Sequence, residues 1–351
     1  MHMRLFTFFK VAGVILAIGG IIFLGWKMFA SKPLLPPSQP KVIAIIQYLP
    51  LLDSAVDGFK EGMAQLGYVE EKDVVYVYHT AEGDKDKVRE IARDVITRDV
   101  DLIYTVTSVA ARGILEETVQ AGRTDIPIVY AHADNPVKTN LAEDLKSSGN
   151  NATGIAVDLT ELTAKRLEIS REFKPSMTRL GVFITLPSVP AGDFMLEELR
   201  EQAPRQEIIL VEYVLETVPG PIATEKLKGV LDTIKPREID AFIAIPSPIT
   251  SDPENTGIIA DAGKRLQIPT IGLTVPQAEA GFLFAYGYDL KQIGHQASVI
   301  ADKIIKGTKP TDIPIEFPQE NMLVVNSKTA DEIGIALPET VYLIADMIIE
   351  R

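Results

Sequence analysis

After its first 40 residues, the chain alternates between short apolar runs and segments whose apolar residues recur at helical spacing. The first of these units sets the pattern. Residues 42–46 are apolar throughout, which is typical of a strand buried on both faces. After a turn, Val56, Phe59 and Met63 recur at the spacing of a helix face, and Gly67 closes the helix. Strands and helices in alternation predict parallel sheets with helices on both faces.

The same alternation continues along the rest of the chain. We expect strands at 42–48, 74–79, 101–106, 127–131, 154–158, 180–185, 208–214, 239–245, 269–273, 282–287 and 322–326. We expect helices at 55–66, 84–98, 109–121, 160–173, 192–203, 222–235, 256–266 and 290–306. So many strands are too many for one ordinary open sheet, and 351 residues suit two domains, so we predict two α/β lobes.

The composition excludes several classes of function. The net charge is −13, and an acidic chain is a poor partner for nucleic acid. There are no cysteines and only four histidines, none paired at ligand spacing, so we expect no metal site. The chain has no phosphate-binding glycine loop, serine-nucleophile elbow or zinc-protease motif. We therefore expect a protein that is not an enzyme and needs no cofactor.

An apolar run dominates the first 30 residues. Val11 to Trp26 holds only apolar residues and glycine, but spans about 24 Å against the roughly 30 Å of a bilayer core. Adding residues 5–9 makes it long enough if Lys10 reaches the membrane surface.

Two interpretations of residues 1–30 stay open, a cleaved signal peptide and an uncleaved signal anchor. We favour an anchor at residues 5–26, because Met28 is a poor residue for the −3 position of a cleavage site. Residues 31–40 hold four prolines and predict an extended linker between the membrane and the globular part.

Several longer segments resemble one family. They are FKEGMAQLGYVE (59–70), AEGDKDKVREIARDVI (81–96), VDLIYTVTSVAA (100–111), DIPIVYAHADNPV (125–137), GNNATGIAVDL (149–159), GYDLKQIGHQASVIADKIIKGTKPTDIPIE (287–316) and LVVNSKTADEIGIALPETV (323–341). In this order and spacing they resemble the ABC-transporter substrate-binding proteins that include receptors for tryptophan and other amino acids. The resemblance covers nearly everything after the linker.

The resemblance implies the type I periplasmic-binding-protein fold, with two doubly wound lobes joined by a hinge and a ligand between them. It places 41–156 and 280–312 in the first lobe. It places 157–279 and 313–351 in the second. The chain would then cross between lobes near 155–158, 278–281 and 311–317.

Polar residues at the predicted strand ends are candidates for ligand contact, because ligands bind at the carboxyl ends of strands in such sheets. In the first lobe these are Gln47, Tyr48, Asp53, Thr107, Ser108, His132 and Asp134. In the second lobe they are Thr185, Ser188, Ser247 and Thr274. Each also has a structural interpretation, such as a helix cap at Thr107 and Ser108, a turn at Asp134, or a core position for Tyr48.

The second-lobe loops depart from the family. Amino-acid-binding members carry acidic residues where this chain has the loop 246–250, Thr274 and Pro276. A ligand ammonium group buried without a carboxylate would be costly. We therefore doubt a free amino acid as ligand and expect a less charged one.

Together these features predict an extracytoplasmic solute-binding receptor of an ABC-type importer. We expect a monomer that is anchored to the cytoplasmic membrane, closes on a small ligand and delivers it to an ABC permease. The alternative is a membrane-anchored sensor that reports the same ligand to a signalling partner, with an enzyme on this fold the least favoured.

Overall fold

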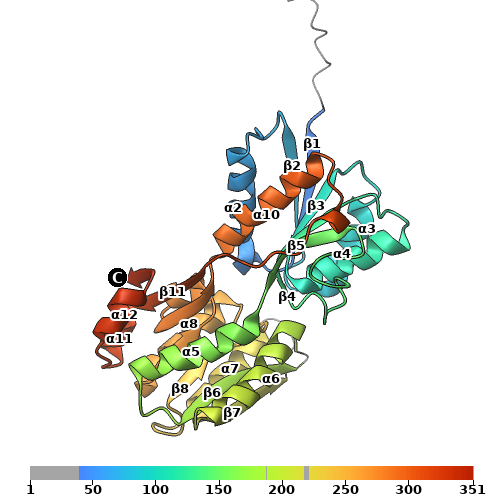
Figure 1. Ribbon diagram of the computed structural model, residues 1–351. Coiled ribbons are helices and arrows are strands. Elements are labelled where there is room, and N and C mark those ends of the chain that lie inside the picture. Colours follow the sequence, from blue (N-terminus) through green and yellow to red (C-terminus); the bar gives the residue numbers. More distant parts are fainter. Residues whose placement is uncertain (1–38, 187, 217–220, 351) are drawn as a thin grey trace, which may run out of the picture. The chain divides into compact units, whose positions relative to one another are not determined.

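The strands form two separate sheets, and helices cover both faces of each sheet (Figure 1). This computed structural model describes residues 39–186, 188–216 and 221–350. The predicted α/β class with two lobes of parallel sheet is confirmed. The anchor predicted at residues 5–26 and most of the linker lie outside the described residues. Within the described part of the chain, no helix has the length and apolarity needed to cross a membrane.

The first sheet has the strand order β2-β1-β3-β4-β5, and every pairing is parallel. Its strands are β1 (Lys41–Gln47), β2 (Val74–Thr80), β3 (Leu102–Val106), β4 (Ile128–Asp134) and β5 (Ala152–Val157). Helices α2 (Asp53–Gln65) and α10 (Leu290–Ile305) cover one face, and α3 (Lys85–Val95) and α4 (Ser108–Gln120) cover the other. Because the strands are parallel, all their carboxyl ends lie along one edge.

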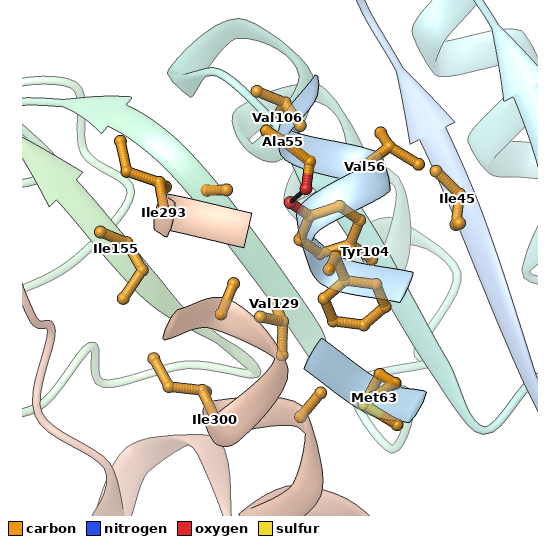
Figure 2. Close-up of a cluster of buried hydrophobic side chains, with 14 of the residues drawn as sticks. Ile45, Ala55, Val56, Met63, Tyr104, Val106, Val129, Ile155, Ile293 and Ile300 are labelled. Carbon is orange, nitrogen blue, oxygen red and sulfur yellow. Dashed lines mark hydrogen bonds between the residues drawn. The ribbon is translucent and has the colours of Figure 1, made fainter. Parts of the chain in front are cut away.

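Strand β1 is buried on both faces, as its apolar run predicts. Ile43 and Ile45 face the α2 and α10 side, whereas Ala44 and Ile46 face the α3 and α4 side. On the first side, the ring of Tyr104 stacks on that of Phe59 with 3.9 Å between centroids. The Tyr104 hydroxyl donates to the carbonyl oxygen of Ala55 at 2.9 Å (Figure 2). The buried phenol is thereby satisfied, and the bond ties β3 to α2.

Glycines let α2 and α10 pack backbone to backbone. A Cβ on Gly58 would lie 2.0 Å from the carbonyl oxygen of Lys291, and one on Gly294 would lie 2.1 Å from that of Ala55. At Gly62 it would meet the Ser298 hydroxyl at 2.2 Å. No side chain fits at such distances, so α10, from late in the sequence, is fixed on the first sheet by these positions.

The second sheet has the order β12-β11-β10-β9-β8-β6-β7, with β10 and β11 the antiparallel pair. Its strands are β6 (Arg179–Leu186), β7 (Ile209–Glu216), β8 (Ala241–Ile243), β9 (Thr270–Gly272), β10 (Phe284–Tyr288), β11 (Asn321–Asn326) and β12 (Met347–Ile349). One face packs on α5 (Leu159–Phe173), α6 (Pro190–Arg205), α11 (Ser327–Glu332) and α12 (Glu339–Ile344). The other packs on α7 (Pro221–Thr233) and α8 (Pro253–Leu266). Short elements η1 (Pro50–Leu52), α9 (Val275–Glu279) and η2 (Pro310–Asp312) complete the fold.

The lobe boundary predicted near residue 280 is wrong in position. Strand β10 pairs with β9 in the second sheet, so 280–288 do not belong to the first lobe. The chain changes lobe between β10 and α10, around Asp289, rather than at 278–281. Ile313 and Ile315 still pack in the first-lobe cores, so the last change of lobe falls after them and before β11.

Candidate functional site

Gln47 and Asp53 hold the loop that follows β1. The Gln47 side chain is fully buried, and its Nε2 donates to Asp53 Oδ1 at 3.0 Å. The same carboxylate oxygen accepts from the Tyr78 hydroxyl at 3.0 Å, and burial, followed by this bond, raises the pKa of Tyr78 to about 12. Tyr48 is buried and packs in the core of the α3 and α4 side, and burial raises its pKa. These contacts fix the conformation of the loop that follows β1.

Thr107 lies at the end of β3 in a strained conformation. Its φ of 86° and ψ of 152° fall in a region that is populated almost entirely by glycine. Its hydroxyl accepts from the Ala110 N–H at 3.4 Å, so it caps α4 only weakly. Ser108 follows, and its Oγ donates to the carbonyl oxygen of Asp134 at 3.0 Å. The structure thus joins the ends of β3 and β4, and three predicted residues meet at one place.

His132 lies in a distortion of β4, where the register with β5 shifts between Tyr130 and Ala133. It has a φ of 53°, in the left-handed region. Burial first, and the positive charge of Arg166 in addition, lower the pKa of His132 to about 4. The imidazole is therefore neutral at neutral pH. Arg166 belongs to α5 of the second lobe. The charge of a second-lobe residue therefore acts on a first-lobe residue at this point.

Two predicted threonines of the second lobe have unsatisfied hydroxyls. Thr185, near the end of β6, is 2% exposed, and its Oγ1 has no hydrogen-bond partner among the described residues. The buried Oγ1 of Thr274, just before α9, likewise has none within the described ranges. Buried hydroxyls without protein partners are unusual, and these two are available to hydrogen-bond a bound molecule.

Ser247 and Ser188 differ from these threonines. The Ser247 Oγ hydrogen-bonds to Thr250 Oγ1 at 3.0 Å and accepts from the Thr250 N–H at 3.2 Å. Both bonds stabilise the turn from Ser247 to Thr250. Gln277 holds that turn to the end of β9, because it donates to the Thr250 carbonyl and accepts from the Leu273 N–H. Ser188 is half-buried after β6.

Arg166 is the functional candidate that our sequence reasoning missed. It is 1% exposed and is the largest of the fully buried side chains among the described residues. Its Nε donates to the carbonyl oxygen of Tyr286 at 2.7 Å. Burial lowers the pKa of its guanidinium to about 9, which still leaves it charged at neutral pH. A signal was present, because Arg166 interrupts the apolar positions Leu162, Ile169 and Phe173 of the helix face that packs inward.

The segments that cross between the lobes are tied to each other. The Tyr288 hydroxyl at the end of β10 donates to the Asp158 carbonyl and accepts from the Asp158 N–H, both at 3.1 Å. Glu316 pairs with β5 as an isolated bridge at Ile155. At the rim of the site, the Lys138 ammonium of the first lobe lies 5.5 Å from the ring centroid of Phe194 in α6. Such short connections suit a hinge.

A separate open groove of about 740 Å³ runs along α5. Glu161, Lys165, Tyr286 and Asn321 are among its lining residues. It includes none of the residues predicted from strand ends.

Comparisons with known proteins agree with this architecture. The chain is 25% identical over 294 residues to the "Tyrosine-binding protein" of Clostridioides difficile (strain R20291), covering 83% of this chain and 80% of that protein. A solved ABC domain in complex with L-Trp from Streptococcus pneumonia has a TM-score of 0.76 at 22% identity, covering 88% of this chain and all of that one. A ligand-free, open substrate binding protein from Clostridium difficile has a TM-score of 0.67 at 20% identity, covering 89% of this chain and 100% of that one.

The structural likenesses establish the fold, and the sequence of the whole described region establishes the family. The model of the family described as ABC transporter substrate binding protein matches residues 41–349. This match spans both sheets and every crossing between them, as the resemblance of the sequence segments led us to expect. The chain belongs to the ABC transporter substrate binding protein family.

Proposed function

We propose that this protein is the extracytoplasmic receptor of an ABC importer and that it clamps a small solute between its two lobes. The observation that carries the proposal is the pair of facing sheet edges. Strained Thr107 and the Ser108–Asp134 link lie at one edge, and the unsatisfied hydroxyls of Thr185 and Thr274 lie at the other. The charge of Arg166 on one lobe acts on His132 of the other. Ligands bind at such edges in doubly wound folds.

Hinge closure is the mechanism that we propose for capture and release. Ligand contacts with both lobes would favour a closed form, because a ligand shifts a conformational equilibrium by its difference in affinity for the two forms. A permease in the cytoplasmic membrane would then read the closed form. The receptor acts as a monomer in this proposal.

We further propose that residues 5–26 keep the receptor on the outer side of the cytoplasmic membrane. Fractionation of producing cells, followed by intact-mass measurement, tests this point. An anchored receptor is found with the membranes at its full mass. A chain that is shortened near residue 30 and found in the soluble fraction would contradict the anchor and leave the binding function intact.

The binding function itself is tested by thermal unfolding of the full chain in mild detergent against amino acids, sugars, nucleosides and small carboxylic acids. A ligand at 100 times its dissociation constant stabilises the folded state by about 2.7 kcal/mol, which moves the midpoint visibly. We expect one chemical class to do so. The relatives named above include a tyrosine-binding protein and a domain solved with L-Trp, so aromatic amino acids belong in the screen. If no class stabilises the protein and no small molecule is released on denaturation, the receptor function is contradicted.

A further inference from the structure

The guanidinium of Arg166 has no anionic partner within the described residues. No carboxylate oxygen of the described chain lies within 4.0 Å of it. By contrast, buried Glu117 is paired with Arg93 at 3.0 Å, and buried Asp302 is paired with Lys306 at 2.8 Å. A buried charge without a counter-ion is strongly unfavourable, so such groups are normally paired. Arg166 departs from this rule.

The two outer nitrogens of Arg166 are the groups left available. Nη1 has the Met195 sulfur as its acceptor at 3.9 Å, which is a weak contact. Nη2 lies 3.7 Å from the position that a Cβ would take on Gly287. Neither nitrogen donates to an oxygen of the described residues, whereas Nε is satisfied by Tyr286. The planar fork formed by Nη1 and Nη2 matches the two oxygens of a carboxylate.

Arg166 lies at the edge of the second sheet where we place the ligand. Gly287, beside its Nη2, is the penultimate residue of β10, and a Cβ on this glycine would lie 2.1 Å from the carbonyl oxygen of Leu273, which follows β9. Thr274, with its unsatisfied hydroxyl, follows Leu273 directly. The first lobe contributes His132 to this region, and the charge of Arg166 helps to lower the pKa of His132.

We propose that Arg166 is the anion subsite of the receptor and that the bound solute carries a carboxylate that pairs with its Nη1 and Nη2. This inference rests on the proposed binding function and specifies the class of ligand. It narrows the expectation of a ligand that is less charged than a free amino acid, which was drawn from the loops alone. In the second lobe, Asp193 and Glu279 are exposed, so no buried carboxylate near these loops offers a partner for an ammonium group. The second lobe therefore offers a charged partner for a carboxylate and none for an ammonium group.

The test uses matched acids and amides, which differ in charge and hardly in shape. Binding of 3-phenylpropanoate, 3-phenylpropanamide, hexanoate, hexanamide and L-phenylalanine to the full chain in detergent is measured by calorimetry. We expect each acid to bind about 100-fold more tightly than its amide, which is about 2.8 kcal/mol at 1.4 kcal/mol per tenfold. In Arg166→Met we expect the acids to lose about that factor and the amides to change less than threefold.

Two further variants separate the charge from the fold. Lys165→Met removes the same charge from the neighbouring, exposed position of α5 and should leave all affinities unchanged. Arg166→Lys keeps the charge but loses the fork, and should lie between wild type and Arg166→Met. Arg166→Lys also provides the comparison with wild type if Arg166→Met does not fold. Because an unpaired buried charge is removed, the melting temperature of ligand-free Arg166→Met should equal or exceed that of wild type.

The outcomes distinguish this inference from the proposed function. Equal affinity of an acid for wild type and Arg166→Met would overturn the anion subsite and leave the receptor standing. Tighter binding of the amides would do the same. Arg166-dependent binding of L-phenylalanine in preference to 3-phenylpropanoate would support the subsite and identify an amino acid as the source of the carboxylate. If wild type binds none of the five while the wider screen finds another, uncharged solute, the subsite is wrong and the receptor is not.

Discussion

Thr107 holds a backbone conformation that a β-branched residue rarely adopts, and it does so at the start of α4. Such strain costs about 1–3 kcal/mol and is kept where the surrounding structure or a function demands it. The Thr107 N–H donates to the carbonyl oxygen of Ala131 in β4. This bond to the sheet holds the backbone of Thr107 in its strained conformation. The start of α4, with its positive dipole end, therefore lies beside the Ser108–Asp134 link.

Replacing Thr107 by glycine should therefore stabilise the protein. Relief of strain outweighs the extra freedom of glycine in the unfolded chain, which costs about 0.4–1 kcal/mol, so we expect a net gain of about 1 kcal/mol. Chemical denaturation measures it. Thr80→Gly, at the end of β2 where φ is not positive, is the matched control and should destabilise the protein. A loss of stability in Thr107→Gly would show that the threonine is not strained.

His132 makes stability depend on pH in acid. Its pKa of about 4 in the folded protein is below the ordinary 6.5, so the unfolded chain binds the proton more readily. The contribution of neutral His132 to the free energy of unfolding is fully present above about pH 6.5. It is lost as the pH falls towards 4, and this lowers the free energy of unfolding by at most about 3 kcal/mol. His132→Asn tolerates the left-handed φ and should lose less stability than wild type between pH 7 and 4.5. Equal losses in the two proteins would contradict the shift.

At the scale of elements, the contact between α2 and α10 connects the two halves of the sequence. Its glycines allow no side chain, so Gly58→Ala should destabilise the protein by about 1–3 kcal/mol through overpacking. Gly229→Ala is the control, since Gly229 lies in α7 with open space around it and should gain about 0.5–1 kcal/mol. Urea unfolding of both variants gives the comparison. A neutral Gly58→Ala would mean that the helices do not pack this closely.

Most helices and strands were predictable, because burial on one or two faces imposes a period on the sequence. Strand β1, expected at 42–48, is found at Lys41–Gln47, and α10, expected at 290–306, is found at Leu290–Ile305. The placement of β10 was not predictable from periodicity, which says that a strand is buried but not against which sheet. Strand β12 was not predicted, and its three residues form one edge of the second sheet.

The candidate site was predictable in outline only. The strand-end rule brought Ser108 and Asp134 together correctly, because parallel strands end at one edge. The rule could not find Arg166, which lies inside a helix and reaches that edge through a long side chain. The strain at Thr107 depends on backbone angles that the sequence does not display.

At the scale of the whole molecule, three short connections join the lobes, and the ligand in our proposal touches both lobes. The bonds between Tyr288 and Asp158 keep two of the connections together. The third connection runs beside β5, where Ala156 donates to the Glu316 carbonyl at 2.8 Å. Movement confined to these segments would change the distance between the lobes and leave each core unchanged.

The most direct test of the central claim is the distance between spin labels on the two lobes, with and without ligand. The chain has no cysteine, so labels can be placed at Val137→Cys after β4 and Leu186→Cys at the end of β6, both exposed. A control pair at Leu66→Cys and Val119→Cys lies within the first lobe. With the best-binding solute of the screen at saturation, we predict a shorter, narrower distance distribution for the first pair and no change for the control. Saturation by calorimetry without any change in the first pair would contradict a receptor that works by closing its lobes.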